Sequence, residues 1–364
     1  DEDRRNFTDM KNIAILSFYS GVVERGVETF TLEISKRLSR SHNVTIFSAG
    51  PMLQQKFKVK HIKSAAKPPK SSRGLLGKLY LDPQSLKILL FTLRSLPVIY
   101  KNKSHILIPL NGGWQVVILR VFSKLTGSKI IISGHAGIGQ DDAWNLFFRP
   151  DVFVALTKAE ELWAKKLVPE VATVVIPNGV DLSRFNPKVK AEDIQLPKPI
   201  VICASALVPY KRVDLTIRAV AKTKNLSLLV LGDGELKGAI DTLGKRLLGS
   251  RYLRMCVPYQ KMPGYYRAGS VFSLASKTEA FGIAYVEAMA CNLPVVTTYD
   301  WSRAEIIGDV GVLTNPQDLR QYAKDLEIVA KTKYGNRPYA QALGFSWNNV
   351  AAKYSQLIEK MLSK

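Results

Sequence analysis

Short apolar runs alternate with amphipathic stretches along this chain, and the alternation predicts a parallel α/β protein. The apolar runs have the length of buried strands. Between them, segments such as Gly26 to Ser39 repeat apolar side chains close to every 3.6 residues, as a helix does when one face is buried. Strands that alternate with such helices are typical of a doubly wound parallel sheet. Strands are predicted at 12–18, 44–47, 106–109, 129–133, 152–156, 173–176, 200–204, 228–231, 271–274 and 294–297.

Length and a polar break predict two domains. The 364 residues exceed what one hydrophobic core usually serves. The run from Arg184 to Pro199 is polar and rich in proline, so the interdomain linker is expected there. The expected parts are an N-terminal Rossmann-like domain at 11–183, a second Rossmann-like domain at 198–344, and a C-terminal segment at 345–364 that holds an amphipathic helix.

Composition is that of a globular protein with reduced cysteines. Hydrophobic residues make up 46% of the chain and charged residues 23%. The three cysteines, Cys203, Cys256 and Cys291, show no metal-ligand spacing, and their odd number argues against a disulfide framework. Buried free thiols in a reducing compartment are therefore predicted. No apolar run reaches the ~18 residues of a membrane span, and the charged N-terminus does not resemble a signal peptide.

Positive charge is the unusual feature of the composition. The net charge is +22, and half of it falls between Gln54 and Lys103, where twelve basic residues face one acidic residue, Asp82. Leucines and other apolar residues are interleaved with these charges, which suits an anionic membrane surface. Nucleic acid would also attract the charge, but no aromatic ladder or recognised nucleic-acid module accompanies it. A solvated basic loop, marked by Pro68-Pro69 and Ser71-Ser72, is the third interpretation.

The segment from Lys277 to Ala290 carries the most informative candidate chemistry. It places Glu279 and Glu287 eight positions apart, around a Phe-Gly pair, directly after a predicted buried strand. A helix starting near Gly282 would present unpaired backbone N–H groups and positive potential to an anion such as a diphosphate. The two carboxylates can accept hydrogen bonds from sugar hydroxyls. A solvated helix face is the competing interpretation of such a spacing.

Further motifs accompany this segment in a fixed order. A Pro-Asn-Gly turn lies at 177–179, Ser205 to Arg212 follows a predicted strand, and Val230 to Glu235 forms a glycine turn. The N-terminal half adds Arg25 to Glu28 and the glycine-flanked His135. Together these motifs resemble glycosyltransferase family 4, the retaining, sugar-nucleotide-dependent transferases with the GT-B fold. The resemblance covers almost the whole chain.

The resemblance implies an architecture. The GT-B fold has two Rossmann-like domains that face each other across a cleft, with the C-terminal helix crossing back to the N-terminal domain. It places the acceptor on the first domain and the nucleotide sugar on the second, with ligands at the carboxyl ends of the strands. No Asp-x-Asp pair suggests a divalent metal, so catalysis without a metal or other cofactor is expected, with the nucleotide sugar as co-substrate.

The resemblance also assigns roles to residues. Glu287 is expected to hold the ribose hydroxyls, Glu279 the donor sugar, and Lys211 the diphosphate, while His135 reaches the sugar near the reacting carbon. Backbone around Met255 to Pro258 is expected to grip the base. The expected catalytic residues are Glu279, Lys211 and His135, and the expected donor-binding residues are Gly26, Arg212, Phe281, Gly282, Ile283, Glu287 and Val257.

One position departs from the family pattern. Family members usually have Gly-Arg-Leu where this chain has Ser205-Ala206-Leu207, and that arginine normally accompanies the lysine on the diphosphate. Arg212 or Arg25 would have to supply the missing charge, or catalysis is weak or absent. Asp233 and Glu235 are expected to cap the helix that follows their glycine turn.

The predicted function is that of a retaining hexosyltransferase. It uses a nucleotide sugar and a lipid-linked or glycan acceptor, and it works in the cytoplasm as a peripheral protein on the inner face of the membrane, attached through residues 54–103. Replacing the lysines of the segment 56–63 should remove binding to anionic lipid. Two alternatives stay open: an inactive GT-B scaffold that binds a membrane or a partner, and a basic nucleic-acid-binding protein.

Overall fold

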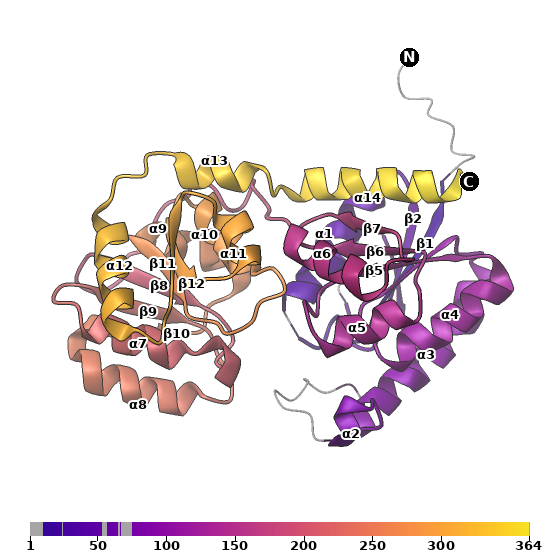
Figure 1. Cartoon of the computed structure of the whole chain (residues 1–364), viewed down its shortest axis with the longest axis horizontal. Coiled ribbons are helices and arrows are strands. Elements are labelled where there is room, and N and C mark those ends of the chain that lie inside the picture. Colours follow the sequence, from indigo (N-terminus) through magenta and orange to yellow (C-terminus); the bar gives the residue numbers. More distant parts are fainter. Residues whose placement is uncertain (1–9, 24, 53–56, 65, 67–74, 364) are drawn as a thin grey trace, which may run out of the picture. The chain divides into compact units, whose positions relative to one another are not determined.

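The chain folds into two compact α/β units, shown in the ribbon of Figure 1. The first unit comprises residues 1–178 and 347–364, and the second comprises residues 179–346. The computed structural model describes residues 10–23, 25–52, 57–64, 66 and 75–363.

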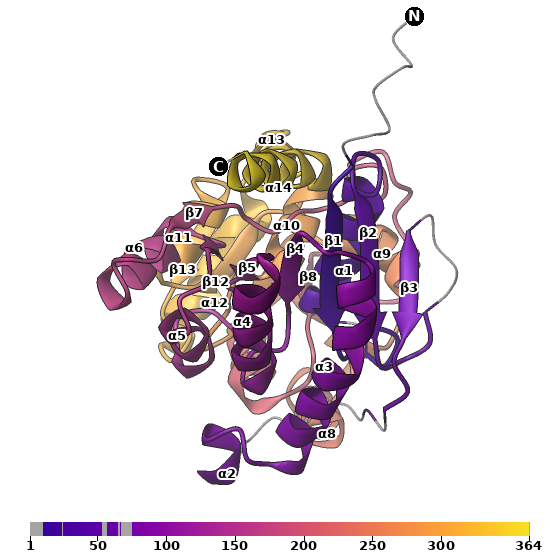
Figure 2. The same cartoon turned by 90° about the vertical axis from the view of Figure 1, so that its right-hand side faces the viewer.

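A parallel sheet with the strand order β3-β2-β1-β4-β5-β6-β7 forms the centre of the first unit. β1 pairs in parallel with both β2 and β4, and five of its six residues are buried. Its apolar run is thus buried on both faces of the sheet, as is usual in parallel sheets. Figure 2 shows β3 at one edge. The strands are β1 (Asn12–Ser17), β2 (Asn43–Ser48), β3 (Lys58–His61), β4 (Ile106–Pro109), β5 (Lys129–Ser133), β6 (Val152–Ala155) and β7 (Thr173–Val175).

Helices connect these strands, and local signals fix where several of them begin and end. Asp82 caps α3 by accepting from the backbone N–H groups of Gln84 and Ser85, and Pro83 occupies the first helical turn. Gly127, in the left-handed conformation, ends α4. The helices are α1 (Gly26–Leu38), α2 (Leu75–Lys78), α3 (Pro83–Lys101), α4 (Trp114–Thr126), α5 (Gln140–Phe147), α6 (Lys158–Leu167) and α14 (Trp347–Leu362).

The C-terminal helix α14 packs on the first unit, which confirms that the chain returns to it. The Tyr354 hydroxyl donates to Ser133 Oγ at 3.0 Å, at the end of β5. Two further hydrogen bonds join α14 to the α1 helix and its C-terminal loop, from Arg37 to Asn348 and between His42 and Ser355, each at 2.8 Å. The prediction of an amphipathic C-terminal helix is also confirmed.

The second unit is built on a parallel sheet with the order β10-β9-β8-β11-β12-β13. Every residue of β8, β9 and β11 is buried. The strands are β8 (Ile200–Ala204), β9 (Ser227–Leu231), β10 (Tyr252–Met255), β11 (Val271–Leu274), β12 (Val295–Thr298) and β13 (Gly311–Thr314). The helices are η2 (Pro209–Lys211), α7 (Val213–Ala221), α8 (Lys237–Leu248), η3 (Gly249–Arg251), η4 (Tyr259–Lys261), α9 (Met262–Ala268), α10 (Ile283–Ala290), α11 (Trp301–Ile307), α12 (Leu319–Lys331) and α13 (Arg337–Leu343).

The boundary between the units lies earlier than the linker expected at 184–199. Residues from Gly179 onward belong to the second unit. The reason is the Phe185 ring, which is fully buried and packs on Tyr259 and Tyr266 with centroid separations of 5.6 and 6.1 Å. Phe185 thus attaches the start of this polar, proline-rich segment to the second unit.

The described part of the basic segment, residues 54–103, consists mostly of regular secondary structure. Strand β3 and helices α2 and α3 cover most of its described part. Residues 53–56, 65 and 67–74, which include the Pro-Pro and Ser-Ser pairs and several of the basic residues, lie outside the described residues. Among the described residues, no helix combines the length and the apolar character needed to cross a membrane.

One expectation about the cysteines is wrong. All three thiols are free, and Cys203 and Cys291 are buried as predicted, but Cys256 is exposed. It follows the last residue of β10, where the strand gives way to a loop. The apolar residues next to Cys256 in the sequence therefore led to a wrong prediction that this thiol is buried.

Candidate active site

An ion pair at the carboxyl ends of the second sheet joins two of the predicted catalytic residues. Lys211 Nζ lies 2.6 Å from Glu279 Oε1, although 68 residues separate them in the chain. Lys211 ends the short helix η2 after β8, and Glu279 lies in the loop between β11 and α10. The side chains are only 15% and 10% exposed. Partial burial strengthens such a pair, because water screens it less than it screens a surface pair.

Arg212 holds the loop that carries Glu279. Its Nε donates to the carbonyl oxygen of Ala275 at 2.7 Å, and its Nη2 lies 3.3 Å from Thr298 Oγ1. The backbone joins the same two segments a second time, since the Lys277 N–H donates to the Tyr210 carbonyl at 2.8 Å. Burial and the charge of Arg303 lower the pKa of Arg212. Its guanidinium is thus partly committed to fixing the geometry of the Lys211–Glu279 pair.

Arg303 is a buried cation in this region that sequence reasoning missed. Its side chain is 1% exposed and forms an ion pair with Asp300 at 2.6 Å. Its Nη2 donates to the carbonyl oxygen of Ser276 at 3.1 Å, and its buried Nε has no hydrogen-bond partner among the described residues. Asp300 also caps α11 through the Arg303 N–H. The cap signature was available in the sequence, but the contact with the loop after β11 depends on the tertiary fold.

The predicted helix after Glu279 is present. α10 begins at Ile283, and Gly282 occupies the N-cap with φ of 86°, a conformation that favours glycine. A Cβ atom on Gly282 would stand 2.3 Å from the Tyr285 ring. Phe281 is 2% exposed and its ring packs on Phe345 at 5.7 Å, so it anchors the loop in the core. The first N–H groups of α10 are consequently held in a fixed place.

Glu287 lies inside α10 with its carboxylate between two tyrosines. The hydroxyl of Tyr259 donates to Oε1 at 2.6 Å, and that of Tyr266 donates to Oε2 at 3.1 Å. The residue is 5% exposed, and burial raises the pKa of its carboxyl group, while the tyrosine hydrogen bonds and the charge of Arg184 oppose that rise. Each carboxylate oxygen can accept more than one hydrogen bond. The predicted ribose-binding carboxylate is therefore held rigidly in place.

Aromatic residues beside the predicted base-binding segment were not anticipated. Val257 is half-buried and lies two residues before Tyr259 in the loop after β10. The guanidinium of Arg184 stands 5.3 Å from the centroid of the Tyr259 ring, within the range of a cation–π contact. Tyr259 is adjacent in sequence to the segment expected to grip the base, and this adjacency was the available signal.

The glycine turn after β9 packs backbone against backbone with the segment 205–207. The Leu207 N–H donates to the carbonyl oxygen of Asp233 at 2.9 Å, and that of Ser205 donates to Leu231 at 3.1 Å. A Cβ atom on Gly234 would stand 2.6 Å from the Leu207 carbonyl oxygen, so no larger residue fits there. This contact fixes the loop that carries Ala206, whose side chain is exposed.

The expectation that acidic residues occupy the cap of the following helix is wrong. α8 begins at Lys237, and the residue at its N-cap is Leu236, which makes no side-chain cap hydrogen bond. Asp233 instead accepts from the Gly234 N–H at 2.8 Å and pairs with Lys237 at 3.7 Å. The N-cap position lies three residues after Asp233 and one residue after Glu235.

His135 follows β5 in the first unit. Its ring packs on Phe30 of α1 with a centroid separation of 4.3 Å, and its backbone N–H donates to the carbonyl oxygen of Ser133 at 2.8 Å. The Nε2 atom is buried and has no hydrogen-bond partner among the described residues. Burial lowers the pKa of His135 to about 3. The imidazole is therefore neutral at physiological pH and offers a hydrogen bond without a charge.

Gly26 is the first residue of α1 and is exposed. The preceding Arg25 is paired with Glu28 through two hydrogen bonds, at 3.1 and 2.8 Å, and it stacks over Tyr19 at 4.7 Å. One of the two arginines proposed to replace the missing positive charge is thus already neutralised within its own helix.

The structure brings the predicted residues of the second unit together at one edge of its sheet. Lys211 and Glu279 are in direct contact, and Arg212 contacts the same loop. Ile283 and Glu287 follow on the adjoining helix α10. The two predicted residues of the first unit, Gly26 and His135, are linked through α1, whose Phe30 contacts the histidine ring.

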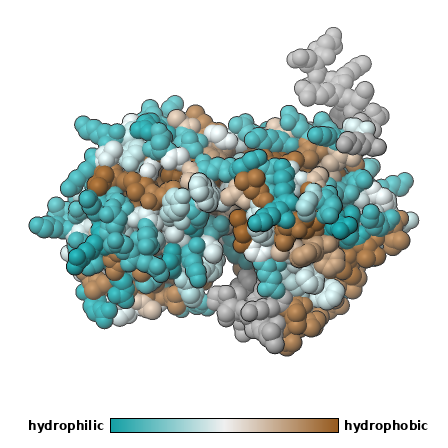
Figure 3. Space-filling model, in the orientation of Figure 1, coloured by the Kyte–Doolittle hydropathy of each residue, from teal (hydrophilic) through white to brown (hydrophobic). Residues whose placement is uncertain are grey.

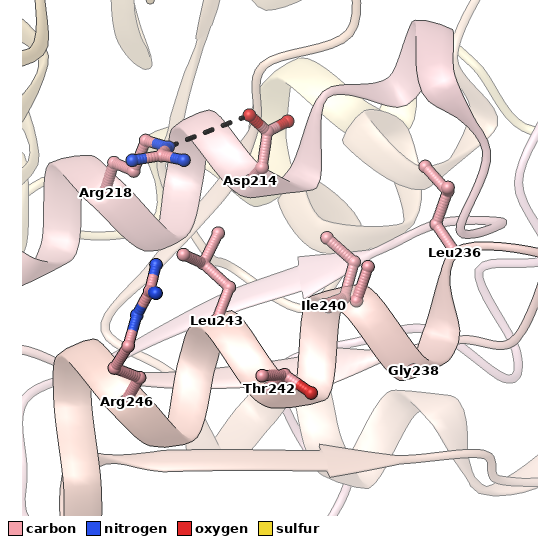
Figure 4. A pocket seen from close by; sticks show the side chains of 9 residues that line it. Asp214, Arg218, Leu236, Gly238, Ile240, Thr242, Leu243 and Arg246 are labelled. Atoms are coloured by element: carbon pink, nitrogen blue, oxygen red, sulfur yellow. Dashed lines mark ion pairs between the residues drawn. The ribbon is translucent and has the colours of Figure 1, made fainter.

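A shallow groove of about 500 Å³ lies elsewhere on the second unit, between α7 and α8. Figure 4 shows Arg246 on one wall, while Arg218 on the other is paired with Asp214 at 3.9 Å. None of the predicted site residues lines this groove. In the part of the chain that the structure describes, no group of three or more His, Cys, Asp or Glu side chains is placed to hold a metal ion.

Comparison with known proteins finds a family model, curated relatives and solved structures that are similar to this chain. Residues 198–331 match the family model described as glycosyl transferases group 1. GDP-mannose-dependent alpha-(1-6)-phosphatidylinositol monomannoside mannosyltransferase from Mycolicibacterium smegmatis is 26% identical over 43% of this chain and 47% of its own length. The phosphatidylinositol N-acetylglucosaminyltransferase GPI3 subunit from Saccharomyces cerevisiae is 30% identical over 45% of this chain and 36% of its own length.

The chain thus spans about half the length, or less, of these curated relatives. Among solved structures, sucrose-phosphate synthase from Thermosynechococcus elongatus superposes with a TM-score of 0.79 at 18% identity, covering 97% of this chain and 99% of that one. A likeness at this identity establishes the fold.

Proposed function

We propose that this chain, a member of the glycosyl transferases group 1 family with the GT-B fold, transfers a hexosyl group from a nucleotide sugar to an acceptor with retention of configuration. The observation that carries the proposal is the partly buried Lys211–Glu279 pair beside the first turn of α10. This arrangement brings together a cation, Lys211, an acceptor for sugar hydroxyls, Glu279, and the oriented N–H groups of α10. All three lie at the carboxyl ends of a parallel sheet.

The proposed reaction needs those three groups. The bond between the anomeric carbon and a diphosphate oxygen breaks, a bond from the acceptor oxygen forms, and the acceptor proton passes to the departing diphosphate. Negative charge grows on that diphosphate in the transition state. Lys211 and the N–H groups of Gly282 and Ile283 stabilise it, because preorganised donors aimed at developing charge are usually the largest electrostatic contribution to catalysis. Glu279 accepts hydrogen bonds from the donor sugar.

Two further residues have proposed roles in binding the nucleotide sugar. Glu287, oriented by Tyr259 and Tyr266, binds the ribose hydroxyls. His135 acts as a neutral hydrogen-bonding group toward the sugar, since its lowered pKa keeps the imidazole uncharged. The name of one relative specifies a GDP-mannose donor, which supports a nucleotide sugar as the donor class here.

A panel of nucleoside diphosphates and their sugars tests the donor site. At 100 times its dissociation constant, the correct ligand is expected to raise the free energy of unfolding by about 2.7 kcal/mol, measured as a thermal shift. Glu287→Gln should reduce this shift, because one carboxylate oxygen becomes a donor. Glu327→Gln, on α12, is the matched control and should retain the full shift. A chain that responds to none of the UDP, GDP or ADP compounds would contradict the proposed donor class.

We also propose that the acceptor is lipid-linked and that the first unit docks on the cytoplasmic face of an anionic membrane. The described residues carry an exposed apolar face on α2, α3 and α4, which appears as brown residues at the lower right of Figure 3. On α3 the exposed side chains follow a helical stripe, at positions 86, 90, 93, 97 and 100. The large members of the face are Leu76, Leu79, Leu81, Leu86, Leu90, Leu93, Tyr100, Val121 and Leu125.

Charge around this face favours anionic lipid as its partner. Arg94, Lys101 and Lys124 are exposed beside the apolar stripe, and Asp82 is the one acidic residue between positions 54 and 126. Apolar side chains flanked by basic ones suit the boundary between headgroups and acyl chains. The names of both curated relatives specify phosphatidylinositol-based acceptors, which supports a lipid-linked acceptor for this chain.

Co-sedimentation with liposomes tests the membrane proposal. Binding to vesicles with anionic lipid is expected at low salt, and it should fall several-fold at 0.5 M salt, because salt screens exposed charges. Replacing Leu90 and Leu93 by asparagine should weaken binding about tenfold or more, since burial of each leucine contributes roughly 1.5–3 kcal/mol.

Leu343→Asn provides the control, because Leu343 is exposed to a similar extent but lies on the second unit. Nucleotide binding should be unchanged in all these variants. Equal binding to anionic and zwitterionic vesicles, or none to either, would exclude docking on an anionic surface.

A further inference from the structure

Two buried carboxyl groups lie directly beneath the loop that carries His135. Asp142 on α5 and Glu160 on α6 are each 1% exposed. Neither forms an ion pair with a basic residue in the part of the chain that the structure describes. Burying an ionisable group without a counter-charge is costly. Two such groups under one loop therefore need an explanation beyond packing.

Asp142 holds the C-terminal side of the loop. Its Oδ2 accepts from the Ala136 N–H at 3.1 Å, and its Oδ1 accepts from the side-chain amide of Asn145 at 3.0 Å. The Oδ1 atom of that asparagine is buried and has no hydrogen-bond partner in the described part of the chain. The carboxyl group thus fixes the backbone immediately after His135.

Glu160 supports the other side of the loop. Its Oε2 accepts from the Leu156 N–H at 2.6 Å, and its Oε1 is buried with no hydrogen-bond partner among the described residues. A Cβ atom on Gly134 would stand 2.3 Å from that Oε1. The backbone just before His135 therefore lies against the carboxyl group, and a side chain at position 134 would have to displace that group.

The protonation of the pair follows from its surroundings. Burial and, to a smaller extent, the nearby Asp142 raise the pKa of Glu160 to about 9, while the hydrogen bond from the Leu156 N–H opposes the rise. Burial likewise raises the pKa of Asp142 to about 7, with Asp141 adding to the rise and hydrogen bonds from Asn145 and the loop amides opposing it. Glu160 is therefore protonated at neutral pH, and the pair avoids the repulsion of two buried negative charges.

We propose that Asp142 and Glu160 are positioning residues that clamp the loop 134–137 from both sides and thereby set the place of the His135 imidazole for the donor sugar. This inference rests on the proposed transferase function. His135 Nε2 has no partner within the described residues, and His135 makes ring contact with Phe30, so its orientation depends on that packing and on the loop backbone.

Two substitutions of Asp142 distinguish positioning of the loop 134–137 from an effect of side-chain packing or of negative charge. Asp142→Ala removes the acceptor of the Ala136 N–H and should lower kcat about 10-fold or more, with a smaller change in the KM of the nucleotide sugar. In Asp142→Asn, a flip of the Asn145 amide turns its unpartnered Oδ1 toward the new side-chain amide, so both hydrogen bonds persist. This variant should keep kcat within about threefold. Loss in both variants would overturn the clamp in favour of a charge effect.

Hydrogen exchange gives a readout that does not need activity. The Ala136 amide should exchange at least 10-fold faster in Asp142→Ala than in the wild type, and at the wild-type rate in Asp142→Asn. Glu170→Ala, an exposed change in the same unit, is the control for both measurements. If the wild type transfers no sugar, the proposed function fails, and unchanged Ala136 exchange in Asp142→Ala would separately overturn the clamp.

Discussion

Replacing Lys211 by methionine should lower kcat for sugar transfer by about 10²- to 10³-fold, the usual effect of removing one preorganised donor from a developing oxyanion. Methionine keeps most of the side-chain volume and removes the charge. The KM of the nucleotide sugar should rise less, because the departing diphosphate gains additional negative charge in the transition state, and the lysine stabilises that added charge. Initial rates over a range of donor concentrations measure both quantities. Lys224→Met, at an exposed position of the same unit, is the control.

The substitution also leaves Glu279 without its partner, so stability must be measured beside activity. Glu279 is 10% exposed, and an unpaired carboxylate at such a position destabilises the fold. The double variant Lys211→Met with Glu279→Gln should recover stability but not activity. If the double variant recovered activity as well, the lysine would act through folding rather than through the diphosphate.

This experiment is informative because the chain has Ala206 where family members usually have an arginine that accompanies the lysine on the diphosphate. The guanidinium of Arg212 donates to Ala275, and that of Arg25 is paired with Glu28. Of the two arginines considered as replacements, Arg25 is neutralised by Glu28, and Arg212 keeps its charge while its guanidinium is held by Ala275 and Thr298. Wild-type rates already near those of Lys211→Met would indicate a scaffold that has lost turnover, and a large difference would indicate that one lysine suffices.

Much of the fold could be predicted because its central strands are continuous apolar runs. β8, β4 and β5 were predicted with the bounds that they have in the structure, since full burial leaves little room for polar residues. The strands β3, β10 and β13 were missed. β3 alternates lysine with valine at a solvent-exposed edge, where charged residues are also useful against edge-to-edge pairing. Local sequence does not distinguish such an edge strand from a basic loop.

The residues of the candidate site could likewise be predicted only in part from the sequence. Glu279 and Lys211 could be named from motif spacing, and the structure brings them within 2.6 Å. Tyr259, Tyr266 and Arg303 could not be named, because their roles arise from contacts between segments that are distant in sequence. A buried arginine is rare enough that sequence reasoning assigns it to the surface by default. The same limit applies to Glu160, whose helix reads as an ordinary solvated one.

Replacing Glu160 by glutamine should remove much of the dependence of stability on pH between about pH 4.5 and pH 9. The folded protein keeps the Glu160 proton up to about pH 9, whereas an unfolded chain releases it near the ordinary value of 4.5. The folded state thus binds more protons, so the stabilisation is complete below about pH 4.5 and declines as the pH rises toward 9. Between pH 5 and pH 8 the wild type should lose on the order of 4 kcal/mol through this one group.

Glutamine keeps the acceptor for the Leu156 N–H and cannot ionise, so the variant should be more stable than the wild type at pH 8 and close to it at pH 5. Urea unfolding at the two pH values measures the difference. The neighbouring Glu161 provides a matched control, because hydrogen bonds from Lys158 and Lys165 lower the pKa of its carboxyl group. Its contribution is present at high pH and is lost as the pH falls, so Glu161→Gln should weaken the protein at pH 8. A Glu160→Gln variant with the pH dependence of the wild type would show that this carboxyl group is ionised in the fold.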